Sequence, residues 1–228
     1  MNHLRTYFRK HWFWFVVNLA AAIPLLWLLW DMALGNLSFN PIKDITLRTG
    51  KPALLVLFAS LACTPAASIL NFRLANSVRK SLGLQAFFYA LLHFLTFIGL
   101  DYAFSLKFIV ADGIATKPFV LVGFTSFIIL LLLALTSTKA SQRWLGKKWK
   151  KLHRWVYAAG VLGVAHFFWL ARASDTRPLL YGSILALLLI VRIPSVHNWL
   201  IHQRQKWYGG ATTPRKPSQR PVKAETMV

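Results

Sequence analysis

The stretch WVYAAGVLGVAHFFWLA, residues 155–171, contains no Asp, Glu, Lys or Arg in 17 consecutive positions. A helix rises about 1.5 Å per residue, so this stretch approaches the roughly 30 Å thickness of a bilayer's hydrocarbon core. A helix is expected because a backbone exposed to lipid must satisfy its own hydrogen bonds. The stretch therefore predicts a transmembrane helix with His166 deep inside it.

Five other stretches share this lack of charged residues. They cover residues 11–30, 53–70, 84–100, 118–138 and 178–191. Together the six predict an all-α membrane protein, a bundle of six transmembrane helices. The composition agrees, since 56% of the residues are hydrophobic and 14% are charged, whereas soluble domains carry about 25% charged residues. The 17 Phe and 10 Trp exclude a disordered chain, and the single Cys excludes a disulfide framework.

The formal net charge of +21 is distributed unevenly along the chain. Of the 27 Lys and Arg residues, 20 lie in the N-terminus, in 71–83, in 139–154 and from Arg192 onward. These regions alternate with loops that hold all five Asp residues. By the positive-inside rule the basic regions are cytoplasmic, which places both termini there. The charge is thus a signal of topology, and no nucleic-acid partner is predicted.

By these criteria the chain divides into three parts. Residues 1–10 form a cytoplasmic N-terminus, 11–195 form the transmembrane domain, and 196–228 form a basic, disordered cytoplasmic tail. The tail is rich in Gly, Pro and Lys, a composition that cannot build a packed core. Its basic residues are expected to attract anionic membrane lipid.

Histidine is the only ionisable side chain inside the six predicted spans. His93 lies nine residues in from Leu84 and His166 eleven residues in from Trp155, so both are roughly 14–17 Å deep on helices running in the same direction. Two imidazoles at matching depth could bind one metal ion from opposite sides. In an apolar bundle with no nearby carboxylate or thiolate, haem b fits better than zinc or copper. The alternative is a pair of core histidines hydrogen-bonded to Thr or Ser.

His153 lies 13 residues before His166. On an ideal helix this spacing puts the two side chains roughly 140° apart, so they cannot ligate the same haem. His153 is therefore either an interfacial residue or a ligand at a second site. Arg79 and other cytoplasmic basic residues could neutralise haem carboxylates or a flavin phosphate, and positive-inside charge is the alternative explanation for them.

The stretch LTSTKASQRWLGKKWKKLHRWVYAAGVLGVAHFFWL, residues 135–170, resembles the signature of the ferric-reductase-like transmembrane family. The matching positions are Thr136-Ser137, Leu145-Gly146, Trp149, Leu152-His153-Arg154 and His166. NPIKDITLRTGKPALLVLFASLACTPA (40–66) and RKSLGLQAFFYALLHFLTF (79–97) resemble one branch of that family. Its members are the haem-binding membrane subunits of periplasmic protein-methionine-sulfoxide reductases.

This resemblance implies a multi-pass protein of the bacterial inner membrane that binds haem b and also FMN. Electrons would pass from a cytoplasmic flavin reductase or the quinone pool to a periplasmic molybdopterin-containing subunit. That partner would reduce methionine sulfoxide and so repair oxidised proteins. The chain itself would be an electron-transfer subunit rather than an enzyme.

The resemblance also implies roles for four residues. His93 and His166 would be the axial ligands of an outer haem, and His153 would be a ligand at an inner site. Relatives with two haems carry a second histidine where this chain has Arg79, which cannot ligate iron but is a candidate cofactor-binding residue. One haem is therefore expected, while a second haem or a flavin stays open.

Two other functions compete with this one. A stand-alone transmembrane metal-ion (ferric) reductase would share the haem chemistry and differ in the electron acceptor. A cofactor-free transporter is less favoured, because no Asp or Glu lies within any predicted span.

Overall fold

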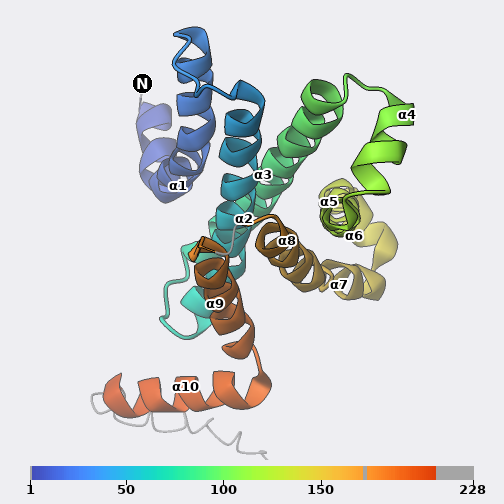
Figure 1. Ribbon diagram of the computed structural model, residues 1–228. Coiled ribbons are helices and arrows are strands. Elements are labelled where there is room, and N and C mark those ends of the chain that lie inside the picture. Colours follow the sequence, from blue (N-terminus) through green and yellow to red (C-terminus); the bar gives the residue numbers. More distant parts are fainter. Residues whose placement is uncertain (1, 172–173, 209–228) are drawn as a thin grey trace, which may run out of the picture.

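The computed structural model describes residues 2–171 and 174–208. Within these ranges every regular element is helical, which confirms the predicted all-α class (Figure 1). The helices are α1 (Asn2–Ala33), α2 (Pro41–Ser68), α3 (Ala75–Leu95), α4 (Leu106–Phe108), α5 (Pro118–Leu135), α6 (Lys139–Leu145), α7 (Lys147–His153), α8 (Val156–Leu170), α9 (Arg177–Ile190) and α10 (Pro194–Tyr208). Two π-helical segments, Thr96–Asp101 and Ile109–Ile114, flank α4.

Four of the described helices are long and apolar enough to cross a membrane. They are His11–Ala33, Pro41–Ser68, Ala75–Asp101 and Pro118–Leu135. Helices α9 and α10 together would form a fifth span if they are taken as one broken helix, but the chain bends by 78° between them. The chain is thus a multi-pass membrane protein, and the count of six spans stays a prediction.

Helix α2 begins at Pro41, twelve residues before the start of the predicted span 53–70. The predicted span is therefore too short at its N-terminal end. The Asn40 side chain caps the helix by accepting a hydrogen bond of 3.0 Å from the Lys43 backbone N–H, and Pro41 occupies the first turn, where its missing N–H is not needed. Lys51 therefore lies inside a spanning helix, and histidine is not the only ionisable residue within the spans.

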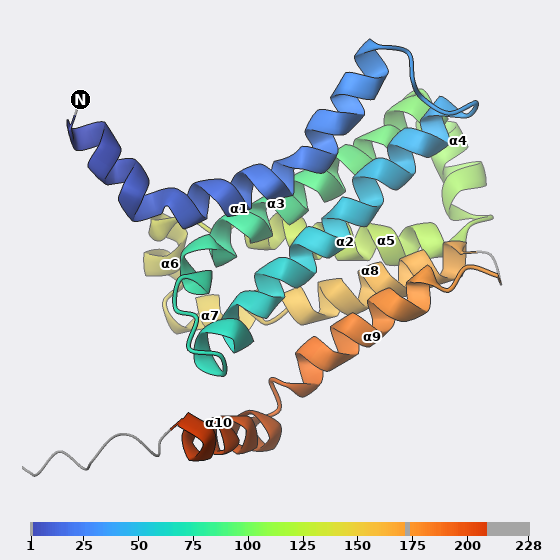
Figure 2. The same cartoon turned by 90° about the vertical axis from the view of Figure 1, so that its left-hand side faces the viewer.

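The bundle is built around two helix pairs. Helices α2 and α3 pack along each other, α5 packs against α8, and α3 contacts α5 and so joins the pairs. Figure 2 shows α1, α2 and α3 running side by side, and α9 packs against both α8 and α2. Ala86 of α3 and Ala159 of α8 are fully buried at these contacts. Their small side chains let the backbones approach closely, as is typical of helix packing in membranes.

Helix α1 packs on α2 and α3 and is bent along its length (Figure 2). Pro24 lies inside it and interrupts its backbone hydrogen bonds. The Tyr89 hydroxyl of α3 enters the gap: it accepts a hydrogen bond of 3.1 Å from the Leu25 N–H and donates one of 2.9 Å to the Ala21 carbonyl. Proline kinks leave such groups to be satisfied by a neighbouring side chain. Tyr89 thereby fixes α1 on the bundle at this point.

The structure differs from the predicted organisation in two regions that the sequence predicts to be cytoplasmic. The basic segment 139–154 is not a plain loop, since it forms α6 and α7, which meet at Gly146 with a backbone φ of +50°. In the predicted disordered tail 196–228, residues up to Tyr208 belong to α10 instead. Residues 209–228 lie outside the described part of the chain.

Candidate functional site

His93 and His166 lie next to each other in the bundle, although 73 residues separate them in the sequence. His93 belongs to α3 and His166 to α8, one helix from each packed pair. The centres of their rings are 6.1 Å apart and the ring planes make an angle of 81°. The structure therefore brings together the two residues that the sequence predicted to share a site.

Each of these imidazoles is held by a backbone carbonyl of the other helix in its own pair. Nδ1 of His93 lies 3.0 Å from the Thr46 carbonyl oxygen of α2, and Nδ1 of His166 lies 2.8 Å from the Phe119 carbonyl oxygen of α5. A carbonyl can only accept, so each Nδ1 carries the proton and donates it. Each Nε2 then keeps a free lone pair, and neither makes a hydrogen bond with the described residues.

A glycine one turn further along the neighbouring helix makes room for each ring. A Cβ built on Gly50 would lie 3.0 Å from Cε1 and Nδ1 of His93. A Cβ built on Gly123 would lie 2.7 Å from Nδ1 of His166. In both pairs the histidine lies 47 residues after the residue whose carbonyl it contacts, and the glycine lies four residues after that carbonyl. The two halves of the bundle thus hold their histidines by the same device.

The two rings line a cavity of about 750 Å³, within the roughly 300–1,000 Å³ range of cofactor sites. Most of its wall is apolar and aromatic and comes from α2, α3, α5 and α8. The charged side chains of the wall lie on α2 and in the segment that begins at residue 101. They are Lys51, Asp101, Asp112 and Lys117, and Tyr102 lies among them. The cavity therefore combines an apolar interior carrying two free imidazole nitrogens with a charged mouth.

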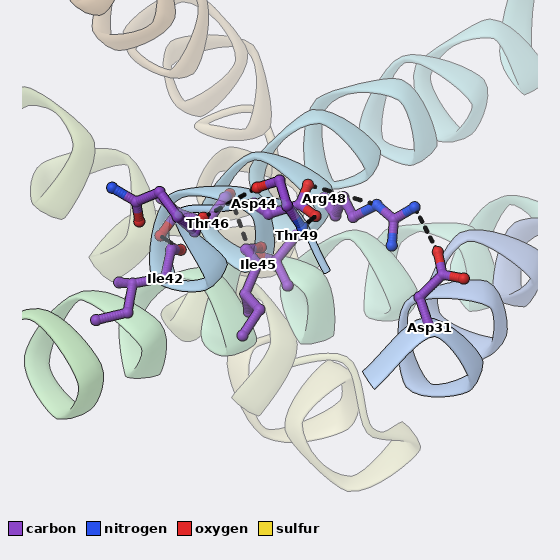
Figure 3. Close-up of polar contacts among 9 residues, drawn as sticks. Asp31, Ile42, Asp44, Ile45, Thr46, Arg48 and Thr49 are labelled. Carbon is purple, nitrogen blue, oxygen red and sulfur yellow. Dashed lines mark hydrogen bonds and ion pairs between the residues drawn. The ribbon is translucent and has the colours of Figure 1, made fainter. Parts of the chain in front are cut away.

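The outer turns of α2, which supply one of the two carbonyls, are tied to α1 (Figure 3). Arg48 forms an ion pair of 2.7 Å with Asp31 at the end of α1 and a longer contact of 3.7 Å with Asp44. The Thr49 hydroxyl donates a 3.1 Å hydrogen bond to the Thr46 carbonyl itself. These contacts hold in place the turn of α2 whose Thr46 carbonyl accepts the hydrogen bond from His93.

His153 lies apart from the pair, at the end of α7. Its ring stacks on Trp149, with ring centres 3.9 Å apart, and its Nδ1 lies 3.3 Å from the Trp149 carbonyl oxygen. Burial lowers the pKa of His153. The hydrogen bond to Trp149 raises this pKa by less, and the nearby charge of Arg79 lowers it further. Its Nε2 is buried and has no partner in the part of the chain that the structure describes. The structure thus places His153 near Arg79, in a second region on the opposite side of the bundle from the charged mouth.

Among the side chains that the structure describes, in residues 11–171 and 174–206, no group of three or more His, Cys, Asp or Glu could hold a metal ion. A metal at the paired histidines would therefore have two protein ligands and would need its remaining ligands from elsewhere, as a porphyrin provides.

The chain is similar to known proteins over most of its length. Residues 49–164 match the family model described as the ferric reductase like transmembrane component. A protein of Yersinia pseudotuberculosis serotype O:1b (strain IP 31758), named protein-methionine-sulfoxide reductase heme-binding subunit MsrQ, is 38% identical over 79% of this chain and 89% of its own length. A protein of the same name from Yersinia pestis (strain Pestoides F) is 38% identical over 79% of this chain and 88% of its own length.

The chain belongs to the MsrQ family, within the ferric-reductase-like transmembrane proteins. The geometry of the paired histidines fits the haem in that family's name. Two imidazoles with ring centres 6.1 Å apart, each with a free Nε2 and both lining one apolar cavity, would suit a porphyrin-bound metal ion. Metal-binding histidines also typically donate their second N–H to a carbonyl or carboxylate, as both do here.

Several residues that shape this site were missed by the sequence analysis. Gly50 and Gly123 were not identified, because an isolated glycine in an apolar helix does not reveal which side chain it faces. Lys51 was missed because the predicted span began after it. The signal that could have found Lys51 was Asn40-Pro41, a helix start that places the lysine inside α2.

Proposed function

We propose that this MsrQ-family chain is an electron-transfer subunit that binds one haem b between His93 and His166. The observation that carries the proposal is the pair of imidazoles, each with Nδ1–H donated to a backbone carbonyl and Nε2 left free at a shared apolar cavity. A core pair of histidines would instead use both ring nitrogens for hydrogen bonds. A haem bound here would supply one-electron redox chemistry.

The residues of the chain would determine how such a cofactor behaves. The Thr46 and Phe119 carbonyls hold each imidazole in one tautomer and increase the basicity of the opposite nitrogen. The apolar wall excludes water from the ligands, which affects the redox potential. The aromatic side chains Phe94, Phe124 and Phe127, which pack on one another along this wall, give the cavity a rigid side.

We also propose the topology that this function needs: six spans in the bacterial inner membrane, with both termini in the cytoplasm. Helices α8 and α9, of 15 and 14 residues, would complete the six. This orientation puts the charged mouth of the cavity on the periplasmic side, as the distribution of Lys and Arg supports. Electrons would enter from a cytoplasmic flavin reductase or the quinone pool and leave to a periplasmic molybdopterin-containing methionine sulfoxide reductase, on which the catalysis takes place.

The inner region around His153 and Arg79 is proposed as a second cofactor position, for FMN or another haem. The support is the buried, unpartnered Nε2 of His153 and the proximity of the Arg79 charge, which suits a phosphate or carboxylate. Arg192 adds another cation to this side of the bundle, where its guanidinium donates to the Leu61 carbonyl and the Tyr157 hydroxyl. Flavin released from the purified protein by acid would distinguish the two cofactors.

The haem proposal is tested by an optical spectrum of the purified full-length protein, with haem quantified as the pyridine complex. The wild-type protein is expected to show the reduced-minus-oxidised spectrum of a low-spin haem b. His93→Ala and His166→Ala should each abolish that spectrum, because one imidazole cannot hold the iron from both sides. His202→Ala, an exposed histidine on α10, serves as the matched control and should leave it unchanged.

The result that contradicts the proposal is equally definite. If the two alanine variants fold and keep the full low-spin spectrum, the iron is not held by these histidines. Copurification of a molybdenum-containing reductase with the wild-type protein would support the proposed acceptor. Reduction of a ferric chelate by the isolated, reduced protein at physiological rates, without such a partner, would favour a stand-alone ferric reductase.

A further inference from the structure

Lys51 is a charged residue in an unusual position. It lies ten residues into α2, directly after Gly50, which contacts the ring of His93. Its side chain lines the same cavity as His93 and His166. An ammonium group at this depth is costly in hydrocarbon unless it has a partner, and such residues in spanning helices usually serve a function.

Nothing in the described part of the chain is a direct partner of the Lys51 ammonium group. It forms no hydrogen bond and no ion pair with the described residues. Arg177, Asp175 and Asp44 influence it only through longer-range electrostatics. A residue that lines the cavity therefore carries an ammonium group whose hydrogen-bonding capacity is unused among the described residues.

The direction of the side chain follows from helix geometry. In an α-helix each Cα–Cβ bond is tilted toward the N-terminus of the helix. The N-terminus of α2 is at Pro41, on the side of the charged mouth. The Cα–Cβ bond of Lys51 is thus tilted toward the mouth, starting beside Gly50, at the level of the His93 ring.

The second lysine of the cavity wall is already neutralised. Nζ of Lys117 lies 2.7 Å from a carboxylate oxygen of Asp112 and 2.8 Å from the Tyr102 hydroxyl. Asp101 also lines the wall but adds a negative charge. Among the cations of the described cavity wall, Lys51 alone is available to an anion.

We propose that the Lys51 ammonium group binds a carboxylate of the porphyrin whose iron the paired histidines hold. This inference rests on the proposed function and adds a contact to it. Haem b carries two carboxylates, and burying one without a cation beside an apolar wall would be unfavourable. A charge-assisted N–H···O hydrogen bond from Lys51 compensates that charge and sets the orientation of the ring in the cavity.

The test compares two ligands that differ only in these carboxylates. Full-length apoprotein, made under haem-limited expression and purified in detergent, is titrated with haem b and with its dimethyl ester. The wild-type protein should bind haem b at least about tenfold more tightly than Lys51→Met does, the effect of losing one charged hydrogen bond. The dimethyl ester should bind both proteins with equal affinity, because it has no charge for Lys51 to compensate.

Two further variants separate this contact from damage to the fold. Lys51→Arg keeps a cation at the site and should restore most of the affinity for haem b. Lys107→Met removes an exposed lysine of α4 outside the cavity wall and should bind both ligands as the wild-type protein does. The midpoint potential of the haem should also fall in Lys51→Met, because a positive charge that favours the reduced state is lost.

The proposal is wrong if Lys51→Met changes the affinities for haem b and the ester by the same factor, or changes neither. That failure is distinguishable from failure of the proposed function. If the wild-type protein shows the low-spin spectrum and the two alanine variants of the histidines lose it, the haem site stands and only the Lys51 contact is rejected. If the wild-type protein binds no haem, both are rejected.

Discussion

Replacing Gly123 with alanine should disturb the proposed haem site through a single methyl group. The new Cβ would lie 2.7 Å from Nδ1 and 2.8 Å from Cε1 of His166, whereas ordinary contacts begin at 3.4 Å. The ring must therefore move by 0.7 Å, the difference between 3.4 and 2.7 Å. Movement along the 2.8 Å hydrogen bond to the Phe119 carbonyl would lengthen it to 3.5 Å, where N–H···O bonds are weak.

The expected consequence is a loss of haem affinity without a loss of the fold. Changes that disturb the hydrogen-bonded support of a metal ligand typically cost about 10–100-fold in metal affinity. Alanine is also preferred over glycine in a helix by roughly 0.5–1 kcal/mol, so α5 itself should form at least as well. We therefore expect Gly123→Ala to bind haem b about 10–100-fold more weakly, at an unchanged melting temperature of the apoprotein.

The assay titrates the purified apoprotein with haem and follows binding by the Soret band. Two other glycine variants serve as comparisons in it. Gly50→Ala brings a Cβ to 3.0 Å from the His93 ring and should have a smaller effect in the same direction. Gly182→Ala meets its nearest atom at 3.7 Å, in Val164, and should bind haem as the wild-type protein does. Wild-type affinity and an unchanged low-spin spectrum in Gly123→Ala would refute the view that this glycine positions the ligand.

Two further predictions concern the stability of the bundle. Hydrogen bonds from Lys117 and from Tyr102 lower the pKa of Asp112 below its usual 3.8. The hydrogen bond to Asp112 raises the pKa of Lys117 above 10.5. Both groups are therefore charged and stabilise the fold at pH values between 3.8 and 10.5. The melting temperature of Asp112→Asn should therefore lie below that of the wild type at neutral pH, and the gap should close as the pH falls below 3.8; a constant gap would contradict this. The Ser126 hydroxyl donates a 2.8 Å hydrogen bond to the Ala159 carbonyl across α5 and α8, so Ser126→Ala should lower the unfolding free energy in detergent by about 0.6–2 kcal/mol. Ser183→Ala, whose hydroxyl bonds within its own helix, is the control, and equal losses in both variants would rule out an interhelical role.

Much of the helical architecture could be predicted from the sequence because burial in lipid leaves few choices. Uncharged runs of nearly bilayer length must be helical, and the run 118–138 corresponds closely to α5. The predicted helix boundaries were less accurate. The uncharged run begins at Ala53, so the predicted span left out the first twelve residues of α2, including Lys51. A charged side chain can remain in a spanning helix when it faces a cavity instead of lipid, and the local sequence does not reveal which side it faces.

The sequence by itself determined that two histidines lie at similar depth in apolar helices, because depth follows from counting residues along a regular helix. Only the tertiary structure decided that their rings meet, that Thr46 and Phe119 accept their Nδ1 protons, and that Gly50 and Gly123 leave space for them. These features depend on how the helices are rotated about their axes and on the distance between helix pairs. Packing of α2 with α3 and of α5 with α8 sets both quantities, and it is a property of surfaces that are far apart in the chain.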